Sequence, residues 1–466
     1  ETRAQFAHGD LKAPPTDEIG PNVAISGVAT FGRLSSSPTG RLNRLFQVVN
    51  NLSHQAGAHA IRVGADFLYN KDRITFPRAV NGAYTSDSMA GPKLAQALRA
   101  ANVFVAELAL DTGDRAAVIG FVGTENRGLA GLEHAYNRQI RGEDGRVLIQ
   151  NDAKGRVFSR FSQPPTAGSS LELTIDRYLQ HITECALEAG VAASRAVGGC
   201  AIIMDPRTGE ILAMANEPTF NPNAYQEFDE SSRRNRAVQD LYEPGSTFKI
   251  VVATAALEEG LVTPDFKVNC GGGASFFGRY FLCHLRGGHG LVDMRHALEK
   301  SCNVYFYTLG NMLGVDRIHK WAENLGLAGR TGIDLPNEQE SIVPSTEWKL
   351  ERTGERWYPG ETISVSIGQG QVTVTPASLA VMIATVANGG TRVTPHVIRA
   401  VDEGAGWKPV APPAVADRIA FRPETLSALH DGLWMVVNAS GTGGRARIAG
   451  RDVAGKTGTA QVIQPD

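Results

Sequence analysis

The chain has 466 residues, of which 42% are hydrophobic and 20% charged, with 46 lysines and arginines against 48 aspartates and glutamates. The formal charge of −2 argues against nucleic-acid binding and against a membrane-surface protein, since both need a basic face. Five cysteines are too few for a disulfide scaffold, and the sequence has no run of 18 apolar residues. Because the chain starts at Glu1 rather than at a methionine, we expect a fragment of an exported or anchored protein.

Residues 1–90 differ in pattern from the rest of the chain. Between Ile61 and Tyr69, apolar side chains alternate with polar ones or glycine, which is the period of a strand. This part carries no cluster of catalytic residue types. A few strands cannot close into a barrel, so we expect a β-rich segment that packs on something else or stays partly disordered.

Residues 91–168 have a mixed α/β pattern with many turns. The segment 93–108 begins as a helix and becomes strand-like, and residues 126–147 predict a helix followed by a hairpin that turns at Glu143-Asp144-Gly145. From about Ser170 a larger α/β unit begins. A strand leads there into an amphipathic helix, and two apolar strands follow around a Pro-Arg-Thr-Gly-Glu turn.

The first candidate motif lies in the stretch YEPGSTFKIVVATAALEEG. Ser246 opens a helical run to about Glu259, and Lys249 lies three residues later on the same face. A serine at a helix start is surrounded by free N–H groups that favour negative charge, and a lysine of lowered pKa could act as its base. The alternative is a serine cap beside a surface lysine. No other lysine in the chain has a serine three residues before it.

The second candidate motif lies in LVDMRHALEKSCNVYFYTLGNMLG, which is helical on both sides of a break near Ser301. Ser301 could relay a proton near the first lysine. Asn303 could hydrogen-bond both that lysine and a substrate amide. Taken alone, a Ser-x-Asn sequence means almost nothing.

The third candidate motif lies in Arg451–Val462, which we predict to be a strand. Lys456 offers a fixed positive charge for a substrate carboxylate and can help to lower the pKa of the first lysine. Gly458 allows a close backbone approach. The N–H of Thr459, paired with that of Ser246, could form an oxyanion hole.

Three of the five cysteines and several histidines gather in a short region. Cys270, Cys283, His289 and Cys302 offer three thiols and one imidazole, a set that suits tetrahedral zinc, although the spacing is not that of a zinc finger. A Cys270–Cys283 disulfide is an alternative, as is an unrelated Cys302 that simply packs on its helix. Two other histidines could take the place of the histidine ligand: His284 and His296.

Ser-x-x-Lys, Ser-x-Asn and Lys-Thr-Gly in this order form the signature of serine penicillin-binding proteins and serine β-lactamases. Over residues 91–466 the sequence resembles the class B penicillin-binding proteins of the elongation-specific type, penicillin-binding protein 2. The Ile-Gly-Gln-Gly run after WYPGET favours this type over the septal one, and the sequence has no glycosyltransferase module. The resemblance rests on GLAGLEHAYNRQIRG, LTIDRYLQ, MDPRTGEILAMAN, YEPGSTFKI, GGHGLVDMRHALEKSCNVYFY, GIDLPNE, RWYPGETISVSIGQGQVTVTP and GKTGTAQV.

The resemblance implies an α/β (α+β) fold of the penicillin-binding and serine β-lactamase type. It also implies a D,D-transpeptidase, in which Ser246 would attack the D-Ala-D-Ala bond of a peptidoglycan stem peptide and would be acylated by β-lactams. No cofactor is expected for catalysis. The implied catalytic residues are Ser246, Lys249, Ser301, Asn303 and Lys456, with Thr457, Gly458 and Thr459 at the substrate and the oxyanion.

Some relatives of the elongation type look similar at the cysteine cluster and carry a structural zinc on acidic, histidine and cysteine ligands. Here Cys270 and Cys283 stand where acidic ligands are seen, which makes the set softer but still suited to zinc. The resemblance therefore implies a structural zinc on Cys270, Cys283, His289 and Cys302. It further implies a place on the periplasmic face of the cytoplasmic membrane, with a SEDS-type glycosyltransferase and other elongation proteins as partners.

We expect three parts in the chain. Residues 1–90 form a β-rich segment that resembles a piece of a TonB-dependent outer-membrane receptor, 91–168 a partial pedestal domain, and 169–466 a transpeptidase domain. From the resemblance we expect that the anchor, the start of the pedestal and the last strands and helix of the family are not part of this sequence. The rival classes are a β-lactamase, for which EQESIVPSTEW gives only a weak deacylating glutamate, a β-lactam sensor and a septal-type transpeptidase.

Overall fold

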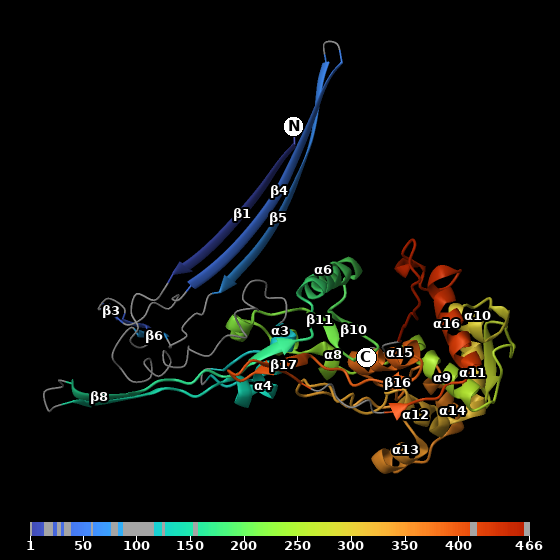
Figure 1. The fold of residues 1–466 in the computed structure, drawn as a ribbon. Helices are drawn as coiled ribbons and strands as arrows, with labels where there is room; N and C mark the ends of the chain where they lie inside the picture. The colour runs from blue at the N-terminus through green and yellow to red at the C-terminus, as the bar shows by residue number, and fades with distance from the viewer. Residues whose placement is uncertain are drawn as a thin grey trace. The chain divides into compact units, whose positions relative to one another are not determined.

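The structure is a computed structural model that describes residues 116–123, 126–151, 157–410 and 417–460, together with six strands between Thr2 and Ser86. Among these residues, no helix has both the length and the apolar character needed to cross a membrane. The chain divides into two compact units (Figure 1). The first comprises 1–107, 123–127 and 136–170, and the second comprises 108–122, 128–135 and 171–466.

The first unit contains a long antiparallel sheet in the order β1-β4-β5 and a small sheet in the order β3-β2-β6. The register of the long sheet places Phe46 between Phe6 and Tyr69. The strand predicted around 61–69 is confirmed, whereas the predicted segment 93–108 lies outside the described residues. The strands are β1 (Thr2–Ala13), β2 (Asn22–Ile25), β3 (Ala29–Phe31), β4 (Thr39–Ala56), β5 (His59–Thr75) and β6 (Ala83–Ser86).

A helix and a hairpin complete the first unit, but the hairpin does not turn where the sequence predicted. The N–H and the C=O of Glu143 both pair with Thr166 at 3.0 Å, so Glu143 lies at the open end of the hairpin. A Cβ on Gly145 would lie 2.8 Å from the carbonyl oxygen of Gln163. The glycine therefore serves a close strand approach rather than a turn. The elements are α5 (Asn137–Ile140), β7 (Arg146–Asn151) and β8 (Val157–Gln163).

Helix α9 (Lys249–Glu258), which is buried up to its last residue, lies at the centre of the second unit. Its residues from Lys249 to Leu257 are all buried, as expected for a helix that is apolar on every side. Four helices pack against it (Figure 1). They are α10 (Met294–Glu299), α11 (Asn303–Leu313), α12 (Val315–Asn324) and α16 (Pro423–Asn438).

A two-stranded antiparallel sheet lies beside this core. Its strands, β10 (Gly199–Met204) and β11 (Ile211–Glu217), form the hairpin that the sequence predicted. Helix α6 (Arg177–Ser194) packs on it and is capped by Asp176, whose carboxylate accepts the N–H groups of Tyr178 and Leu179 at 2.9 Å. Helix α15 (Pro376–Ala387) contacts β10.

The remaining elements of the second unit are short. A three-stranded sheet in the order β18-β17-β9 and several two-stranded pairs connect the helices. The strands are β9 (Ser170–Leu173), β12 (Val268–Cys270), β13 (Gly273–Phe276), β14 (Arg279–Leu282), β15 (Gly290–Val292), β16 (Thr391–Arg392), β17 (Ile398–Asp402), β18 (Trp407–Pro409) and β19 (Asp417–Arg418). The helical elements are α3 (Ala116–Ile119), α4 (Gly131–Ala135), η2 (Pro222–Glu227), α7 (Glu230–Arg233), α8 (Arg236–Gln239), η3 (Gly245–Phe248), α13 (Thr346–Thr353), α14 (Pro359–Val365) and η4 (Gly444–Ala446).

Candidate active site

Ser246 lies in the 3-10 turn η3, which runs directly into α9. The predicted helical run is thus confirmed, with a tighter turn at its start. Gly245 has a φ of +53°, and its N–H donates to the carbonyl of Gly368 at 2.9 Å. A Cβ on Gly245 would lie 2.3 Å from the carbonyl oxygen of Thr459. Only glycine fits this position, where the serine turn meets two other segments.

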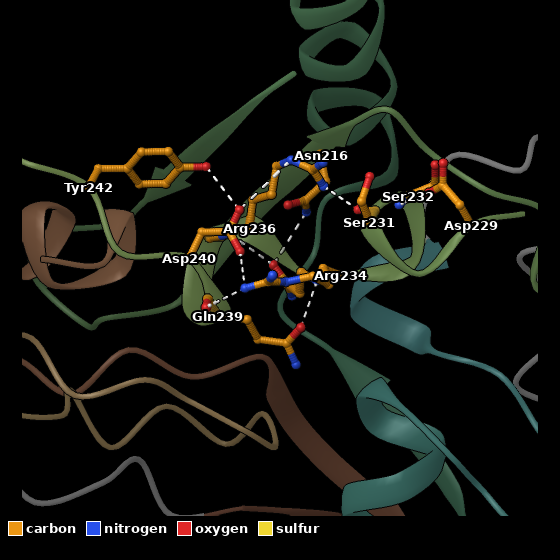
Figure 2. A network of polar contacts seen from close by, with 11 residues as sticks. Asn216, Asp229, Ser231, Ser232, Arg234, Arg236, Gln239, Asp240 and Tyr242 are labelled. Carbon is orange, nitrogen blue, oxygen red and sulfur yellow. Dashed lines mark hydrogen bonds and ion pairs between the residues drawn. The ribbon is translucent and has the colours of Figure 1, made fainter. Parts of the chain in front are cut away.

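A polar network fixes the chain just before this turn (Figure 2). The carboxylate of Asp240 forms an ion pair with Arg234 at 2.6 Å and accepts a hydrogen bond from the hydroxyl of Tyr242 at 3.1 Å. Arg236 lies 4.0 Å from the same carboxylate. The backbone of Tyr242 pairs in both directions with Val374 at 2.9 Å. These contacts hold the segment that leads to Ser246.

Lys249 is completely buried one turn after Ser246. Its Nζ donates to the carbonyl of Ser301 at 2.8 Å and to Oδ1 of Asn303 at 2.7 Å, and lies 3.0 Å from Oγ of Ser301. Burial, and secondly the charge of Lys456, lower the pKa of Lys249 to about 7. The structure therefore brings the first two motifs together around a lysine that is half neutral near pH 7.

Ser301 forms the predicted break between α10 and α11. It has a φ of +53°, a conformation that is costly for any residue other than glycine. The two contacts that Lys249 makes with Ser301, through the carbonyl and Oγ, help to hold this kink. Cys302 is the N-cap residue of α11 and is fully buried.

Lys456 approaches the same serine from the other side. Its Nζ donates to Oγ of Ser301 and to the carbonyl of Thr457, both at 3.0 Å. Burial lowers the pKa of Lys456 to about 8. Oγ of Ser301 thus lies between the amino groups of Lys249 and Lys456, and two ammonium groups this close favour a neutral form of one of them.

The predicted strand Arg451–Val462 is wrong over its described part, because residues 451–460 form no strand ladder. Two hydrogen bonds of the backbone of this segment go to α16 instead. The N–H of Gly455 donates to Leu433 at 3.1 Å, and the side-chain amide of Asn438 donates to the carbonyl of Val453 at 2.7 Å. A strand pattern needs a neighbouring strand to pair with, and here the neighbour is a helix.

The three residues after Lys456 run past the serine turn. A Cβ on Gly458 would lie 3.1 Å from the carbonyl oxygen of Pro244, which is the close approach expected of this glycine. Oγ1 of Thr457 lies 2.6 Å from Oγ1 of Thr442. Sequence reasoning missed Thr442, because its surroundings, SGTGG, predict only a turn. The carbonyl of Thr459 faces the serine turn at Gly245, as described above.

The cysteine cluster lies directly behind the second motif. The ligand atoms of Cys270, Cys283, His289 and Cys302 all lie within 4.8 Å of one another. Nδ1 of His289 is 3.6 Å from the sulfurs of Cys270 and Cys283, and sulfur and nitrogen ligands of a tetrahedral zinc are also about 3.6 Å apart. The donor set therefore fits zinc in type, number and spacing.

The structure bears on two of the alternatives for this cluster, the disulfide and the other histidines. All cysteines are free, so Cys270 and Cys283 form no disulfide. His296 pairs with Asp293 at 2.8 Å rather than with the cysteines. Nδ1 of His284 lies 3.9 Å from the sulfur of Cys283, further away than that of His289.

Comparison with known proteins defines the class. Residues 199–466, more than half of the chain, match the family described as the penicillin binding protein transpeptidase domain, and the chain belongs to this family. The penicillin-binding α/β fold predicted from the sequence is confirmed. Among solved structures, the chain is 31% identical to Pseudomonas aeruginosa penicillin-binding protein 2 in complex with WCK 5153, covering 75% of this chain and 79% of that one with a TM-score of 0.63.

Several of the relatives are MrdA or penicillin-binding protein 2 proteins, which supports a class B protein of the penicillin-binding protein 2 type. The chain is 38% identical to the peptidoglycan D,D-transpeptidase MrdA of Acinetobacter baumannii, over 73% of this chain and 52% of the relative. It is also 27% identical to a chain of a peptidoglycan synthase complex that coordinates polymerization and crosslinking, covering 98% of this chain and 82% of that one with a TM-score of 0.61. The chain spans about half the length of the curated relatives it matches.

The N-terminal segment has a different likeness. Residues 2–119 match a family described as an outer membrane beta barrel domain. This match agrees with the barrel-like pattern of the segment. It does not support the TonB-dependent receptor that the sequence suggested, since the family is a different one.

Proposed function

We propose that the protein is a peptidoglycan D,D-transpeptidase of cell-wall elongation that acts through an acyl-enzyme on Ser246. The observation that carries this proposal is the contact of Lys249 with Ser301 and Asn303, one turn after Ser246, closed from the other side by Lys456. This arrangement supplies a nucleophile, a buried base and a fixed cation in one place.

The acylation step uses these groups in order. Lys249 in its neutral form takes the proton of the Ser246 hydroxyl, and Oγ of Ser246 bonds to the carbonyl carbon between the two D-alanines. The C–N bond then breaks, and the proton passes to the leaving amine of the terminal D-alanine. An amine of a neighbouring stem peptide then attacks the ester carbonyl, the C–O bond to Ser246 breaks, and the proton that the amine loses passes to Oγ of Ser246. A β-lactam follows only the first half, because its leaving amine stays attached.

The remaining residues bind and polarise the substrate. Lys456 and the hydroxyl of Thr457 receive the carboxylate of the terminal D-alanine, while Gly458 lets the backbone come close. The N–H groups of Ser246 and Thr459 receive the developing oxyanion. The contact of the Thr459 backbone with Gly245 supports this last role, because it brings the two segments together.

Labelling with a fluorescent penicillin tests the proposal. Wild type should form a stable adduct, and Ser246→Ala should form none. Equal labelling of the two proteins would refute the proposed nucleophile. Rapid release of the label from wild type would instead favour a β-lactamase.

The cysteine cluster holds a structural zinc in this proposal. Cys270, Cys283, His289 and Cys302 would bind the ion, which would stabilise the region behind the second motif and take no part in the reaction. Purified protein should contain about one zinc per chain, and Cys302→Ser should lose it and melt at a lower temperature. Cys185→Ser, at an exposed cysteine, is the matched control. Protein without zinc whose melting temperature falls on reduction would indicate a disulfide instead.

The relatives support a proposal for the setting of the reaction. We place the site on the periplasmic face of the cytoplasmic membrane, with stem peptides and β-lactams as ligands, no nucleic acid, and a SEDS-type glycosyltransferase and other elongation proteins as partners. The likeness to a peptidoglycan synthase complex chain supports these partners. Residues 169–466 would form the transpeptidase domain, 91–168 a partial pedestal, and 1–90 a separate β-rich segment.

A further inference from the structure

A loop between α16 and the Lys-Thr-Gly segment lies against both substrate-binding motifs and has no role in the chemistry above. It starts at Ser440 and carries Thr442. Gly441 and Gly443 fold it tightly onto the last turn of α16, since a Cβ on Gly441 would lie 2.4 Å from Cα of Val436. The N–H of Gly443 donates to the carbonyl of Val436 at 2.9 Å.

A buried carboxylate anchors the start of this loop. Glu299 is only 2% exposed, and its Oε1 accepts hydrogen bonds from the N–H of Ser440 at 3.1 Å and from its hydroxyl at 2.9 Å. A carboxylate is costly to bury, and hydrogen bonds to the ionised form are among the strongest that offset this cost. Glu299 is the last residue of α10 and lies two residues before Ser301, so the anchor is next to the second motif.

The helix pair behind the anchor is closely packed. At Gly432 of α16, a Cβ would lie 2.7 Å from the side chain of Leu298 of α10. Arg295 of α10 donates to Asp431 of α16 at 3.0 Å. The loop therefore starts at the end of a helix whose position relative to α10 is fixed. The hydrogen bonds from Ser440 to Glu299 also fix the first residue of the loop relative to α10.

The far end of the loop reaches the substrate side of the site. Oγ1 of Thr442 lies 2.6 Å from Oγ1 of Thr457, and both hydroxyls are near the surface. A threonine hydroxyl has one proton and can accept two hydrogen bonds, whereas a carboxylate can only accept. If Thr442 donates to Thr457, the proton of Thr457 is left for a carboxylate beside Lys456.

We infer that Thr442 and Glu299 are positioning residues for recognition of the substrate carboxylate. Glu299 holds the loop through Ser440, and Thr442 orients the hydroxyl of Thr457 toward the carboxylate. This inference rests on the proposed function, since it assumes that Ser246 is acylated beside that carboxylate. It adds a selectivity for anionic over neutral acyl donors that depends on two residues outside the three motifs.

The test compares a labelled penicillin with its methyl ester, which lacks the negative charge. Thr442→Val should lower the second-order acylation rate about tenfold with the free acid, because one hydrogen bond to a charged group is lost. The same variant should lower the rate with the ester by less than about twofold. Thr442→Ser, which restores the hydroxyl, should recover the rate with the free acid. Ser440→Ala and Glu299→Gln should show a smaller loss with the same selectivity.

Each outcome of this test either supports the inference or overturns it. Equal loss with acid and ester, or no recovery in Thr442→Ser, would overturn the inference while the proposed function stands. A wild type that neither compound labels would overturn the proposed function and this inference with it. Melting temperatures identify any variant that fails to fold. If Glu299→Gln does so, the pair Thr442→Val and Thr442→Ser still gives the answer.

Discussion

The two sides of the candidate site are built differently. The helical side carries Ser246, Lys249, Ser301 and Asn303 and borders the buried core. Lys249 is fully buried and Ser301 is 5% exposed, while Ser246 and Asn303 are half-buried. The extended side, residues 453–459, is partly exposed and forms no strand ladder. Packing fixes the geometry of the helical side. A few hydrogen bonds to α16, and to the loop that follows α16, fix the geometry of the extended side. We expect proton transfer to depend on the first and ligand recognition on the second.

Removing the buried base should have the largest effect. Lys249→Ala should lower the rate of acylation by labelled penicillin about a thousandfold, the usual range for loss of a general base. Lys267→Ala, at an exposed lysine, should leave the rate unchanged. Stopped-flow labelling measures both. A rate in Lys249→Ala within a factor of a few of wild type would assign the base to another group.

The next effect lies at the junction of the two sides. Gly245→Ala puts a methyl group 2.3 Å from the carbonyl oxygen of Thr459 and should push the extended side away, lowering acylation about a hundredfold. Gly278→Ala is the matched control, because Gly278 also has a positive φ but meets no atom within 4 Å. Similar losses in both variants would mean that backbone strain, and not the contact, is responsible.

The pH dependence of acylation should show that Lys456, on the extended side, acts on the pKa of Lys249, on the helical side. Lys249 must be neutral to accept a proton, so acylation should fall as the pH drops through about 7, tenfold per unit below it. Lys456→Ala removes a charge that lowers the pKa of Lys249, so the midpoint of the profile should move to higher pH, by about one unit or less. An unchanged or lowered midpoint would show that Lys456 does not act on Lys249.

The smallest effect concerns stability. Because the pKa of Lys249 is lowered from 10.5 to about 7 by folding, protonation opposes folding between these values, and the penalty is complete below the lower one. Lys249→Met should therefore raise the melting temperature by a few degrees at pH 6–7, and the gain should shrink toward pH 10. A gain that does not vary with pH would indicate better packing instead of relief of charge burial.

The sequence allowed the helical side to be predicted well and the extended side less well. Ser246 and Lys249 are three residues apart on one helix, so their proximity follows from local geometry, and the break at Ser301 follows from the chain leaving one helix for the next. The packing of α10 on α16 joins residues more than a hundred positions apart. No local pattern signals such a contact, which is why Thr442 and the ladder-free course of residues 451–460 were missed.

The same distinction applies to the misplaced turn at Glu143-Asp144-Gly145. Gly145 was interpreted as a turn residue but lies where two strands come close, because glycine permits both and only tertiary contacts decide between them. The cysteine cluster is the opposite case. Its thiols and His289 were grouped by chemical type despite unusual spacing, and the fold brings their ligand atoms together.

The most direct test of the account is the position of the acyl adduct. After reaction with a labelled penicillin, trypsin should release residues 237–249, AVQDLYEPGSTFK, which end at Lys249 and contain Ser246. The account predicts that the mass of the β-lactam is found on this peptide and that fragmentation places it on Ser246. An adduct on any other residue, or none on wild type, would contradict it.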